Sequence, residues 1–317
     1  MGATHSSSTT MGSVTGLDKD WLQREAAFYF LEQLVERHGE ILPYAELQSG
    51  FEFDGQRVGL VSMRGIWKPA AMELPISIRT GIKDPYGDDA GPDGLLHYRY
   101  FQRDPNHSDN VGLRRCFEQG RPIIYFRAVE AGQYQTLWPM VIVNDDPGTL
   151  TFTVACEDVK ALRPGLRPDV VDDARRSYVT RMAMTRLHQS KFSFKVLAAY
   201  QESCAVCSIK HRALLDAAHI LPDGHKRGDP IVPNGMALCK IHHAAFDSNI
   251  LGIRPDRSDT GIVEIRADIL KERDGPMLRY GLQELHKKPL RVVPEKRSLR
   301  PDASRLEERY KEFRAAS

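Results

Sequence analysis

The sequence contains no long hydrophobic run and almost no excess charge. No segment reaches the run of about 18 apolar residues that a membrane-spanning helix needs, so no membrane span is expected. The formal net charge is only +2. This value does not by itself indicate nucleic-acid binding, because DNA-binding domains are often far more basic, although a balanced total can hide one basic face.

The N-terminus lacks the apolar segment of a secretion signal. Residues 1–16 are rich in Ser, Thr and Gly, which indicates a disordered lead or a cloning remnant. The chain also lacks an even set of cysteines, because five are an odd number for a disulfide framework. Two of the five form a CxxC pair, which in an intracellular protein favours metal ligation over a disulfide. We therefore expect a cytoplasmic protein.

The chain is long enough for two compact domains, with 317 residues, of which 41% are hydrophobic. Apolar residues at helical spacing predict an opening helix at 21–37. From Gly50 to Cys156, short runs rich in β-branched and aromatic residues alternate with turn residues, which is typical of strands. These runs lie at 58–62, 74–80, 122–129, 138–143 and 150–156, with one predicted helix at 109–120. The first domain is thus predicted to be a mostly β, curled sheet or open barrel.

The second half of the chain is predicted to be a smaller domain of mixed structure, which makes the whole protein α+β. Residues 164–173 are a Pro- and Asp-containing linker, and helices are predicted at about 173–188, 192–200 and 303–315. The predicted divisions are a lead at 1–20, a first domain at 21–163, a linker and helix at 164–190, a second domain at 191–290 and a charged helical tail at 291–317.

Two pairs of metal-ligand residues bracket one segment of the second domain. Cys204 and Cys207 form the CxxC pair, and Cys239 and His242 form a C-x-x-H pair roughly thirty residues later. Zinc prefers four soft or borderline ligands in a tetrahedron, and ligands of such a pair can both be presented by one turn. The spacing therefore predicts a structural Zn²⁺ site with these four ligands.

Three further polar residues lie in the same segment in a characteristic order. His219 stands in AHI (218–220), Asn234 in PNG (233–235) and His243 in HHAAFD (242–247). Over about fifty residues this segment resembles the HNH family of ββα-metal nucleases. The resemblance implies a zinc-stabilised ββα-metal domain that hydrolyses phosphodiester bonds in DNA with a single catalytic divalent ion, such as Mg²⁺ or Mn²⁺.

The resemblance also implies a role for each residue. His219 is the general base, and the usual histidine pKa of about 6.5 suits that work near neutral pH. Asn234 orients this base through a backbone contact. His243 binds the catalytic ion, and Asp247, one helical turn later, is a second candidate ligand. His242 and His243 serve different metals, because neighbouring residues on a helix point about 100° apart.

The segment departs from the family pattern at one position. Many HNH enzymes have an Asp or His metal ligand immediately before the base, whereas Ala218 stands there in this chain. Three alternatives remain open: the ion has fewer protein ligands, Asp216 substitutes for the missing ligand, or a water molecule does.

A loop in the first domain resembles a second family. Tyr86, Asp89 and Tyr98, in YGDDAGPDGLLHY (86–98), have the spacing of the base pocket of SRA domains, which are PUA-like β-barrels that bind DNA with a flipped 5-methylcytosine. A flipped base needs aromatic faces to replace stacking worth roughly 1–3 kcal/mol, and an acceptor for its exocyclic amine. The family's Gly-rich turn is absent after Tyr98, where RYFQRD (99–104) stands.

Other interpretations of these first-domain residues remain open. Asp88, Asp89 and Asp93 also fit solvated carboxylates in turns. Three candidates for DNA contacts lie in the loop after a strand: Arg64, Trp67 and Lys68. Trp67 fits a packing residue equally well.

Taken together, the two resemblances imply a modification-dependent restriction endonuclease of the SRA–HNH type. Its partner would be double-stranded DNA containing 5-methylcytosine or 5-hydroxymethylcytosine. One active site cuts one strand, so a double-strand break needs a homodimer or two sequential nicks. The alternatives are an HNH nuclease whose PUA-like domain recognises another modification or RNA, and a protein that binds modified DNA without cutting it.

Overall fold

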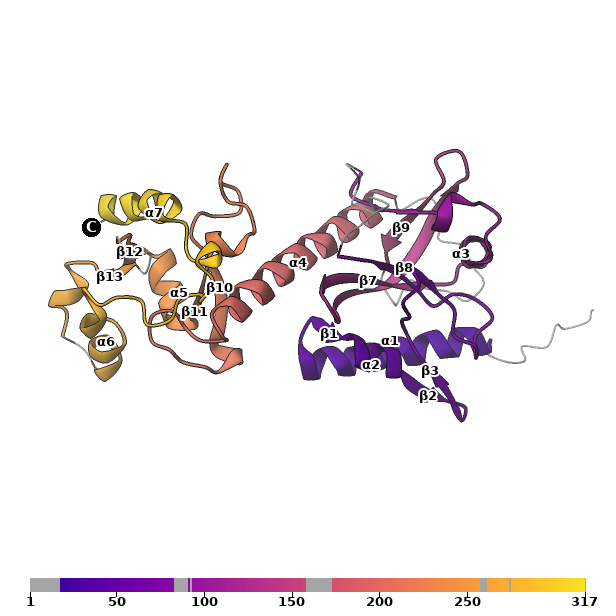
Figure 1. Cartoon of the computed structure of the whole chain (residues 1–317), viewed down its shortest axis with the longest axis horizontal. Helices are drawn as coiled ribbons and strands as arrows, with labels where there is room; N and C mark the ends of the chain where they lie inside the picture. The colour runs from indigo at the N-terminus through magenta and orange to yellow at the C-terminus, as the bar shows by residue number, and fades with distance from the viewer. Residues whose placement is uncertain are drawn as a thin grey trace, which may run out of the picture. The chain divides into compact units, whose positions relative to one another are not determined.

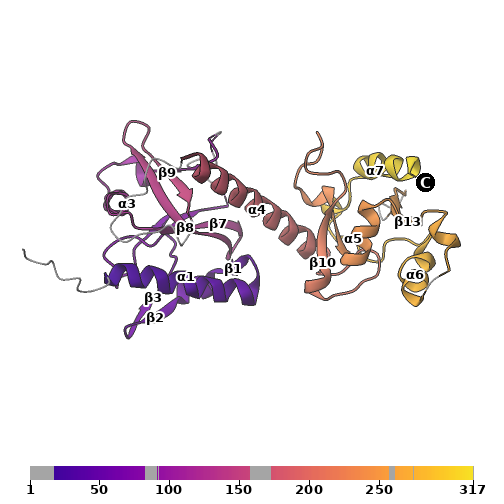
Figure 2. The same cartoon turned by 180° about the vertical axis from the view of Figure 1, so that it is seen from behind.

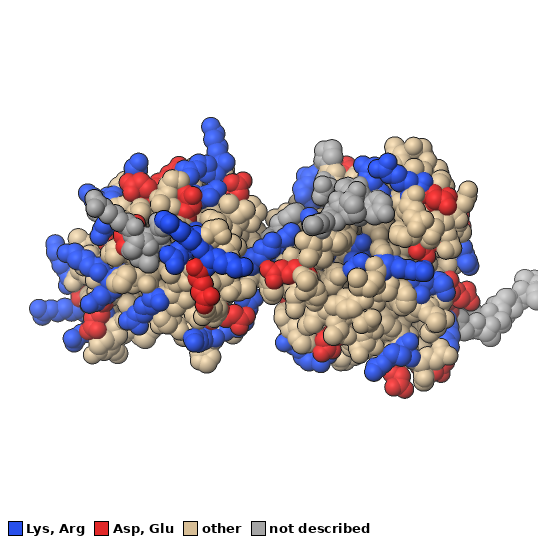
Figure 3. Space-filling view, in the orientation of Figure 1, with Lys and Arg blue, Asp and Glu red and all other residues tan. Residues whose placement is uncertain are grey.

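The computed structural model describes residues 18–82, 91, 93–157, 173–256, 261–273 and 275–316. The chain divides into two compact units, residues 1–184 and 185–317 (Figure 1). No helix within the described ranges is both long and apolar enough to cross a membrane. On the face seen in Figure 3, basic and acidic side chains are interspersed over both units, in keeping with the small net charge.

The first unit is built around one curled sheet. Its elements, in chain order, are α1 (Lys19–His38), β1 (Ile41–Pro43), α2 (Tyr44–Ser49), β2 (Phe51–Phe53), β3 (Gln56–Val58), β4 (Ile66–Trp67), β5 (Ser77–Thr80), β6 (Leu96–Arg99), α3 (Ser108–Glu118), β7 (Ile123–Glu130), β8 (Gln133–Asp146) and β9 (Thr151–Cys156). The strand order is β4-β5-β7-β8-β9-β6, with β1 also paired to β8, and only β5 and β7 run parallel. Register shifts in β8 against both neighbours bend the sheet.

The core of this unit lies between α1 and the sheet, which lie side by side in both views (Figures 1 and 2). Residues of α1 at helical spacing, among them Ala27, Leu31 and Leu34, are fully buried against alternate residues of β7, including Ile124 and Phe126. The periods of 3.6 and 2 bring the apolar face of the helix onto one face of the strand. The predicted opening helix is confirmed, and it extends one or two residues further at each end than the sequence pattern indicated.

The second unit contains the ββα arrangement that the sequence predicts. Its elements are the end of α4 (Asp173–Ala199), β10 (Leu215–His219), β11 (Gly235–Cys239), α5 (Lys240–Asp247), β12 (Leu251–Arg254), β13 (Ile262–Ile265), α6 (Pro276–Gly281) and α7 (Ala303–Ala315). β10 and β11 form an antiparallel hairpin in which His219 lies opposite Gly235. β12 and β13 form a second hairpin. The α+β fold class is therefore confirmed.

The helix predicted at 303–315 is confirmed, whereas α4 differs from its predicted form. The two helices expected at 173–188 and 192–200 are one continuous helix, α4, because no Pro or Gly interrupts residues 173–199. The boundary between the two units falls within it, after Met184. The final helix, α7, packs on β12 with Leu306 and Phe313 buried, so the charged end of the chain belongs to the core of the second unit. The predicted linker lies almost wholly outside the described residues.

A buried ion pair in α1 allows a test of this fold. Arg24 is completely buried, and its guanidinium donates to both carboxylate oxygens of Asp20, at 2.7 and 3.2 Å, and to the carbonyl of Pro122. Asp20→Ala should lower the free energy of unfolding by about 3–5 kcal/mol, because it leaves a buried cation without its partner. Tryptophan fluorescence in urea measures this, since the three tryptophans of the chain, Trp21, Trp67 and Trp138, all lie in the first unit.

Asp54→Ala is the matched control. It removes the partner of an exposed pair with Lys19, which lies on the same helix as Asp20, and such exposed pairs contribute little to stability. An equal loss of unfolding free energy in the two variants would show that the buried Asp20–Arg24 pair stabilises the fold no more than an exposed pair does.

Candidate active site

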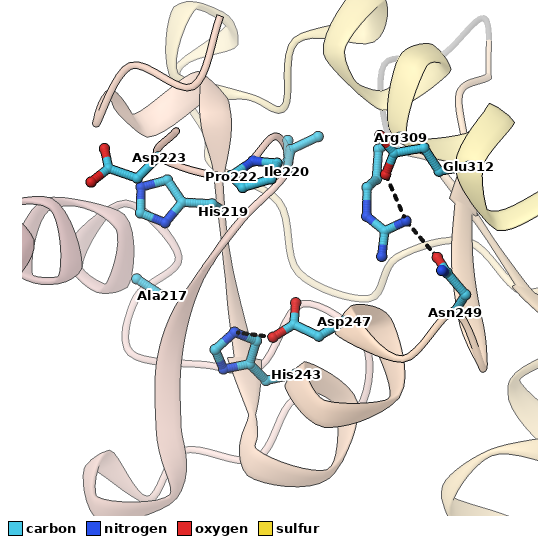
Figure 4. A pocket seen from close by; sticks show the side chains of 10 residues that line it. All are labelled: Ala217, His219, Ile220, Pro222, Asp223, His243, Asp247, Asn249, Arg309 and Glu312. Carbon is cyan, nitrogen blue, oxygen red and sulfur yellow. Dashed lines mark hydrogen bonds and ion pairs between the residues drawn. The ribbon is translucent and has the colours of Figure 1, made fainter. Parts of the chain in front are cut away.

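A cavity of about 480 Å³ opens in the second unit at the end of β10 (Figure 4). Strand β10, helix α5 and helix α7 contribute to its wall, together with the loops that follow β10 and α5. The residues that line it are Ala217, His219, Ile220, Pro222, Asp223, His243, Asp247, Asn249, Arg309 and Glu312. The cavity thus brings together three residues that the sequence singled out, His219, His243 and Asp247.

His219 is the last residue of β10 and is half-buried. Its imidazole stacks on the ring of Phe192 from α4, with centroids 4.0 Å apart and an interplanar angle of 14°. Its Nε2 atom is buried and has no hydrogen-bond partner among the described residues, which leaves Nδ1 as the nitrogen able to serve the cavity. Burial lowers the pKa of His219, although the charge of Asp223 acts in the opposite direction. The neutral imidazole, which can accept a proton, is therefore favoured.

Asn234 fixes the backbone that follows His219. Its side chain is fully buried, and Oδ1 accepts a hydrogen bond from the amide of Leu221 at 3.0 Å. Its Nδ2 donates to the carbonyls of Leu221 and Asp229, at 3.0 and 3.1 Å. The residue does not line the cavity, so its contribution is to hold the chain on which His219 is mounted.

His243 is held by a carboxylate on each side of its ring. Nδ1 lies 3.1 Å from Oδ2 of Asp216, and Nε2 lies 3.3 Å from Oδ2 of Asp247, one turn later on α5 (Figure 4). Asp247 lines the cavity, whereas Asp216 does not, and Asp216 also pairs with Lys240. Burial acts to raise the pKa of Asp216, but hydrogen bonds from Lys240 and His243 outweigh it and hold this pKa below its usual value.

The geometry bears on the ligand missing at Ala218. This alanine is completely buried, while its neighbours Ala217 and His219 line the cavity, because successive residues of a strand point to opposite faces. On the cavity side, Nε2 of His243 and the carboxylate of Asp247 are close enough for one ion to contact both. An imidazole with a carboxylate suits divalent ions such as Mn²⁺, and carboxylates suit Mg²⁺.

The second predicted set of ligands forms one cluster on the other side of α5. The ligand atoms of Cys204, Cys207, Cys239 and His242 all lie within 4.8 Å of one another. Nε2 of His242 hydrogen-bonds to the carbonyl of Gly281 at 2.8 Å, and Nδ1 faces the sulfurs of Cys204 and Cys239 at 3.5 and 3.1 Å. Hydrogen bonds from Cys204 and Cys207 lower the pKa of Cys239, which favours the thiolate that binds metal. The donor set fits a four-coordinate metal ion.

The first-domain candidates lie outside this cavity. Tyr86 and Asp89 fall within residues 83–90, outside the described residues. Tyr98 lies on β6 and is only 4% exposed, with its hydroxyl 3.5 Å from the carbonyl of Arg79. Of the loop candidates, Arg64 and Lys68 are exposed, although Lys68 also donates to the carbonyl of Met72. Trp67 is half-buried and donates to the carbonyl of Gly59.

Sequence reasoning missed several residues of the cavity. Asp223 follows His219 by four positions and could have been found from that proximity. Arg309 and Glu312 come from α7, about ninety residues after the base, and no motif links them to it. Arg309 donates to the carbonyl of Phe246 at 2.6 Å and to Oδ1 of Asn249 at 2.5 Å. Phe192, which stacks on His219 but does not line the cavity, lies before the motif, on α4.

Comparison with known proteins agrees with this site. A family model described as HNH endonuclease matches residues 204–254. Among solved structures, the modification-dependent restriction endonuclease TagI is 17% identical, with 88% of this chain and 89% of that chain covered and a TM-score of 0.30. The Type IV phosphorothioation-dependent restriction endonuclease ScoMcrA is 17% identical, with 58% and 54% covered and a TM-score of 0.19. No curated protein matches the sequence.

The family match does not depend on those distant structural likenesses. It spans the four residues of the metal cluster as well as His219, Asn234 and His243. Residues 204–254 therefore form an HNH endonuclease domain, and this protein is a nuclease.

Proposed function

We propose that this nuclease is a modification-dependent DNA endonuclease, in which the first unit binds DNA with a flipped 5-methylcytosine or 5-hydroxymethylcytosine and the HNH domain cuts the backbone. The observation that carries the catalytic half is the cavity shared by His219 and the His243–Asp247 pair. A base and a metal-binding pair on one cavity are what hydrolysis of a phosphodiester requires.

Each of these residues would have a different role in the reaction. Nδ1 of His219 would accept the proton of the attacking water, and Asn234 keeps the chain beyond the base in place. Nε2 of His243 and the carboxylate of Asp247 would hold the ion, which when bound stabilises negative charge on the phosphate and the leaving oxygen. Asp216 accepts from Nδ1 of His243 and so keeps Nε2 directed at the ion.

We assign Zn²⁺ to the cluster of three cysteines and His242. Thiolate and imidazole ligands in a buried, closed tetrahedron are typical of structural zinc. The hydrogen bond from Nε2 of His242 to Gly281 supports this assignment, because it leaves the lone pair on Nδ1 for the metal.

The proposal for the first unit rests on the Tyr86, Asp89 and Tyr98 spacing in the sequence. Two aromatic rings and a carboxylate supply the stacking and the amine acceptor that a flipped cytosine needs. A small apolar niche for the 5-methyl group is worth only about 1 kcal/mol, so the 5-hydroxymethyl group would be tolerated. Arg64 and Lys68 are the exposed loop candidates for a phosphate contact. Two cuts, by a homodimer or in sequence, would break both strands.

One experiment tests the whole proposal. A plasmid prepared with and without cytosine methylation is incubated with the protein and either Mg²⁺ or Mn²⁺. Methylated plasmid should be cut at enzyme concentrations that leave unmodified plasmid intact. Equal cutting of both would mean that the first unit recognises another modification or RNA, and no cutting of any DNA with any ion would contradict the endonuclease itself.

Metal removal tests the structural cluster. Protein purified without added zinc should contain about one zinc per chain, because structural sites contribute directly to folding. Cys204→Ser should lose the ion and make the second unit sensitive to protease. Cys116→Ser is the control, since Cys116 is buried in the first unit, away from the cluster. Full stability of Cys204→Ser, with no metal in the wild type, would overturn the assignment.

Replacement of the base tests the catalytic role of His219. His219→Ala should reduce the cleavage rate by about 10²–10⁴-fold, while DNA binding and zinc content stay unchanged. His225→Ala is the control, because this histidine pairs with Glu308 and does not line the cavity. The lowered pKa of His219 keeps the base neutral into mild acid, so the wild-type rate should fall only below pH 6.5. If His219→Ala cuts DNA at the wild-type rate, His219 is not the general base and another histidine must be.

Replacement of Asp89 tests recognition separately from cutting. Asp89→Ala should weaken binding of methylated DNA by roughly ten- to a hundredfold, because losing the amine acceptor costs on the order of 1–3 kcal/mol. Slow nicking of unmodified DNA at high enzyme concentration should persist, since the HNH site is untouched. Asp88→Ala is the neighbouring control and should keep the preference for methylated DNA. Unchanged preference in both Asp89→Ala and Tyr98→Ala would contradict the proposed pocket.

A further inference from the structure

Three histidines of the HNH domain, His219, His242 and His243, are held in place in different ways. His242 bonds to the carbonyl of Gly281, and His243 contacts a carboxylate at each ring nitrogen. His219 has no such support: within the described part of the chain, no hydrogen bond holds its imidazole, and Nε2 is buried without a partner. Catalytic bases are ordinarily oriented by a third group that bonds to them. Something else must therefore fix the plane of this ring.

Among the described residues, Phe192 is the aromatic residue that stacks on that ring. This phenylalanine is 3% exposed and lies almost parallel to His219 at 4.0 Å between centroids, so it covers one face of the imidazole. Rotation of the His219 ring about its last side-chain torsion would drive its edge into the phenyl face. In the absence of contacts this torsion adopts a broad range of values, so we infer that stacking on Phe192 restricts it.

A glycine on the opposite strand makes room for this stack. Gly235 pairs with His219 across the β10–β11 hairpin. A Cβ atom there would lie 2.7 Å from Cζ of Phe192 and 2.5 Å from Cγ2 of Val196, closer than real contacts allow. The backbone of Gly235 is extended, with φ −133° and ψ 152°, so its conformation does not demand glycine. Glycine is required at this position because Phe192 occupies the space that a Cβ atom would fill.

We propose that Phe192 is a positioning residue for the nuclease reaction, which holds the His219 ring with Nδ1 directed into the cavity. The proposal rests on the assignment of His219 as the base. Phe192 lies outside the segment that matches the HNH family, on α4. The catalytic unit of this chain therefore includes the end of α4, and a fragment that starts at residue 204 would lack a part of its active site.

The test is Phe192→Leu, which keeps an apolar side chain in the core but removes the ring. The rate of plasmid cleavage at saturating enzyme should fall by about ten- to a hundredfold, because small misplacements of a catalytic group have effects of this size. The Kd for DNA and the zinc content should not change. In NMR spectra of histidine-labelled protein, the ring protons of His219, assigned with His219→Ala, should lose the upfield shift caused by the phenyl ring.

Two further variants separate positioning from simple loss of stability. Val196→Ala truncates a buried residue one turn along the same helix that also faces Gly235, and it should retain activity within about threefold at a temperature where all variants are folded. Gly235→Ala should reproduce the loss seen in Phe192→Leu, because the new methyl group displaces the phenyl ring.

The outcomes separate this inference from the assignment of the base. If His219→Ala is inactive while Phe192→Leu cuts at the wild-type rate with an unchanged His219 spectrum, the positioning role is wrong and the base stands. If Val196→Ala loses as much activity as Phe192→Leu, the effect is one of core stability and the inference is again wrong. If His219→Ala remains active, the assignment of the base has failed, and this inference fails with it.

Discussion

The metal cluster of three thiols and one imidazole is the constraint on which the active site depends. Its ligands come from the loop after α4, the end of β11 and the first turn of α5, so it locks the start of that helix to the hairpin. Since His242 faces the cluster, His243, about 100° further round the helix, must face away from it. That direction is toward the cavity. The structural cluster thus sets the orientation of the proposed catalytic ligands without touching them.

The far end of α5 is held by an element that lies beyond the HNH motif. Arg309 of α7 donates to the carbonyl of Phe246 in the last turn of the helix, which also accepts from the amide of Asn249. The guanidinium carbon of Arg309 lies 4.7 Å from the centre of the Phe246 ring. A helix of eight residues has few hydrogen bonds of its own. It keeps His243 and Asp247 in place because the cluster fixes one end and α7 the other.

The motif residues could be predicted from the sequence, whereas the residues that hold them in place could not. Spacing alone indicated that Cys204, Cys207, Cys239 and His242 would meet, because short-range spacing along a turn fixes where ligands point. Phe192 and Arg309 act through contacts between segments distant in the chain, which leave no local pattern. The same limit applies to α4, whose polar stretch at 188–191 interrupts the apolar periodicity but contains no residue that ends a helix. The pocket spacing in the first unit remains a prediction.

The small net charge offers a physical reason why recognition and cutting would lie in separate units, as proposed. Non-specific affinity for DNA comes mainly from the release of counterions by Lys and Arg, and it grows with the number of phosphates neutralised. The chain has a net charge of only +2, and on the face seen in Figure 3 acidic side chains are interspersed among the basic ones, so that face offers few unopposed charges to phosphates. An HNH domain on such a chain would dissociate from most DNA before it cut. Under the proposed function, stable residence would depend on the energy returned by a specific base pocket, and cleavage would be confined to DNA that carries the modification.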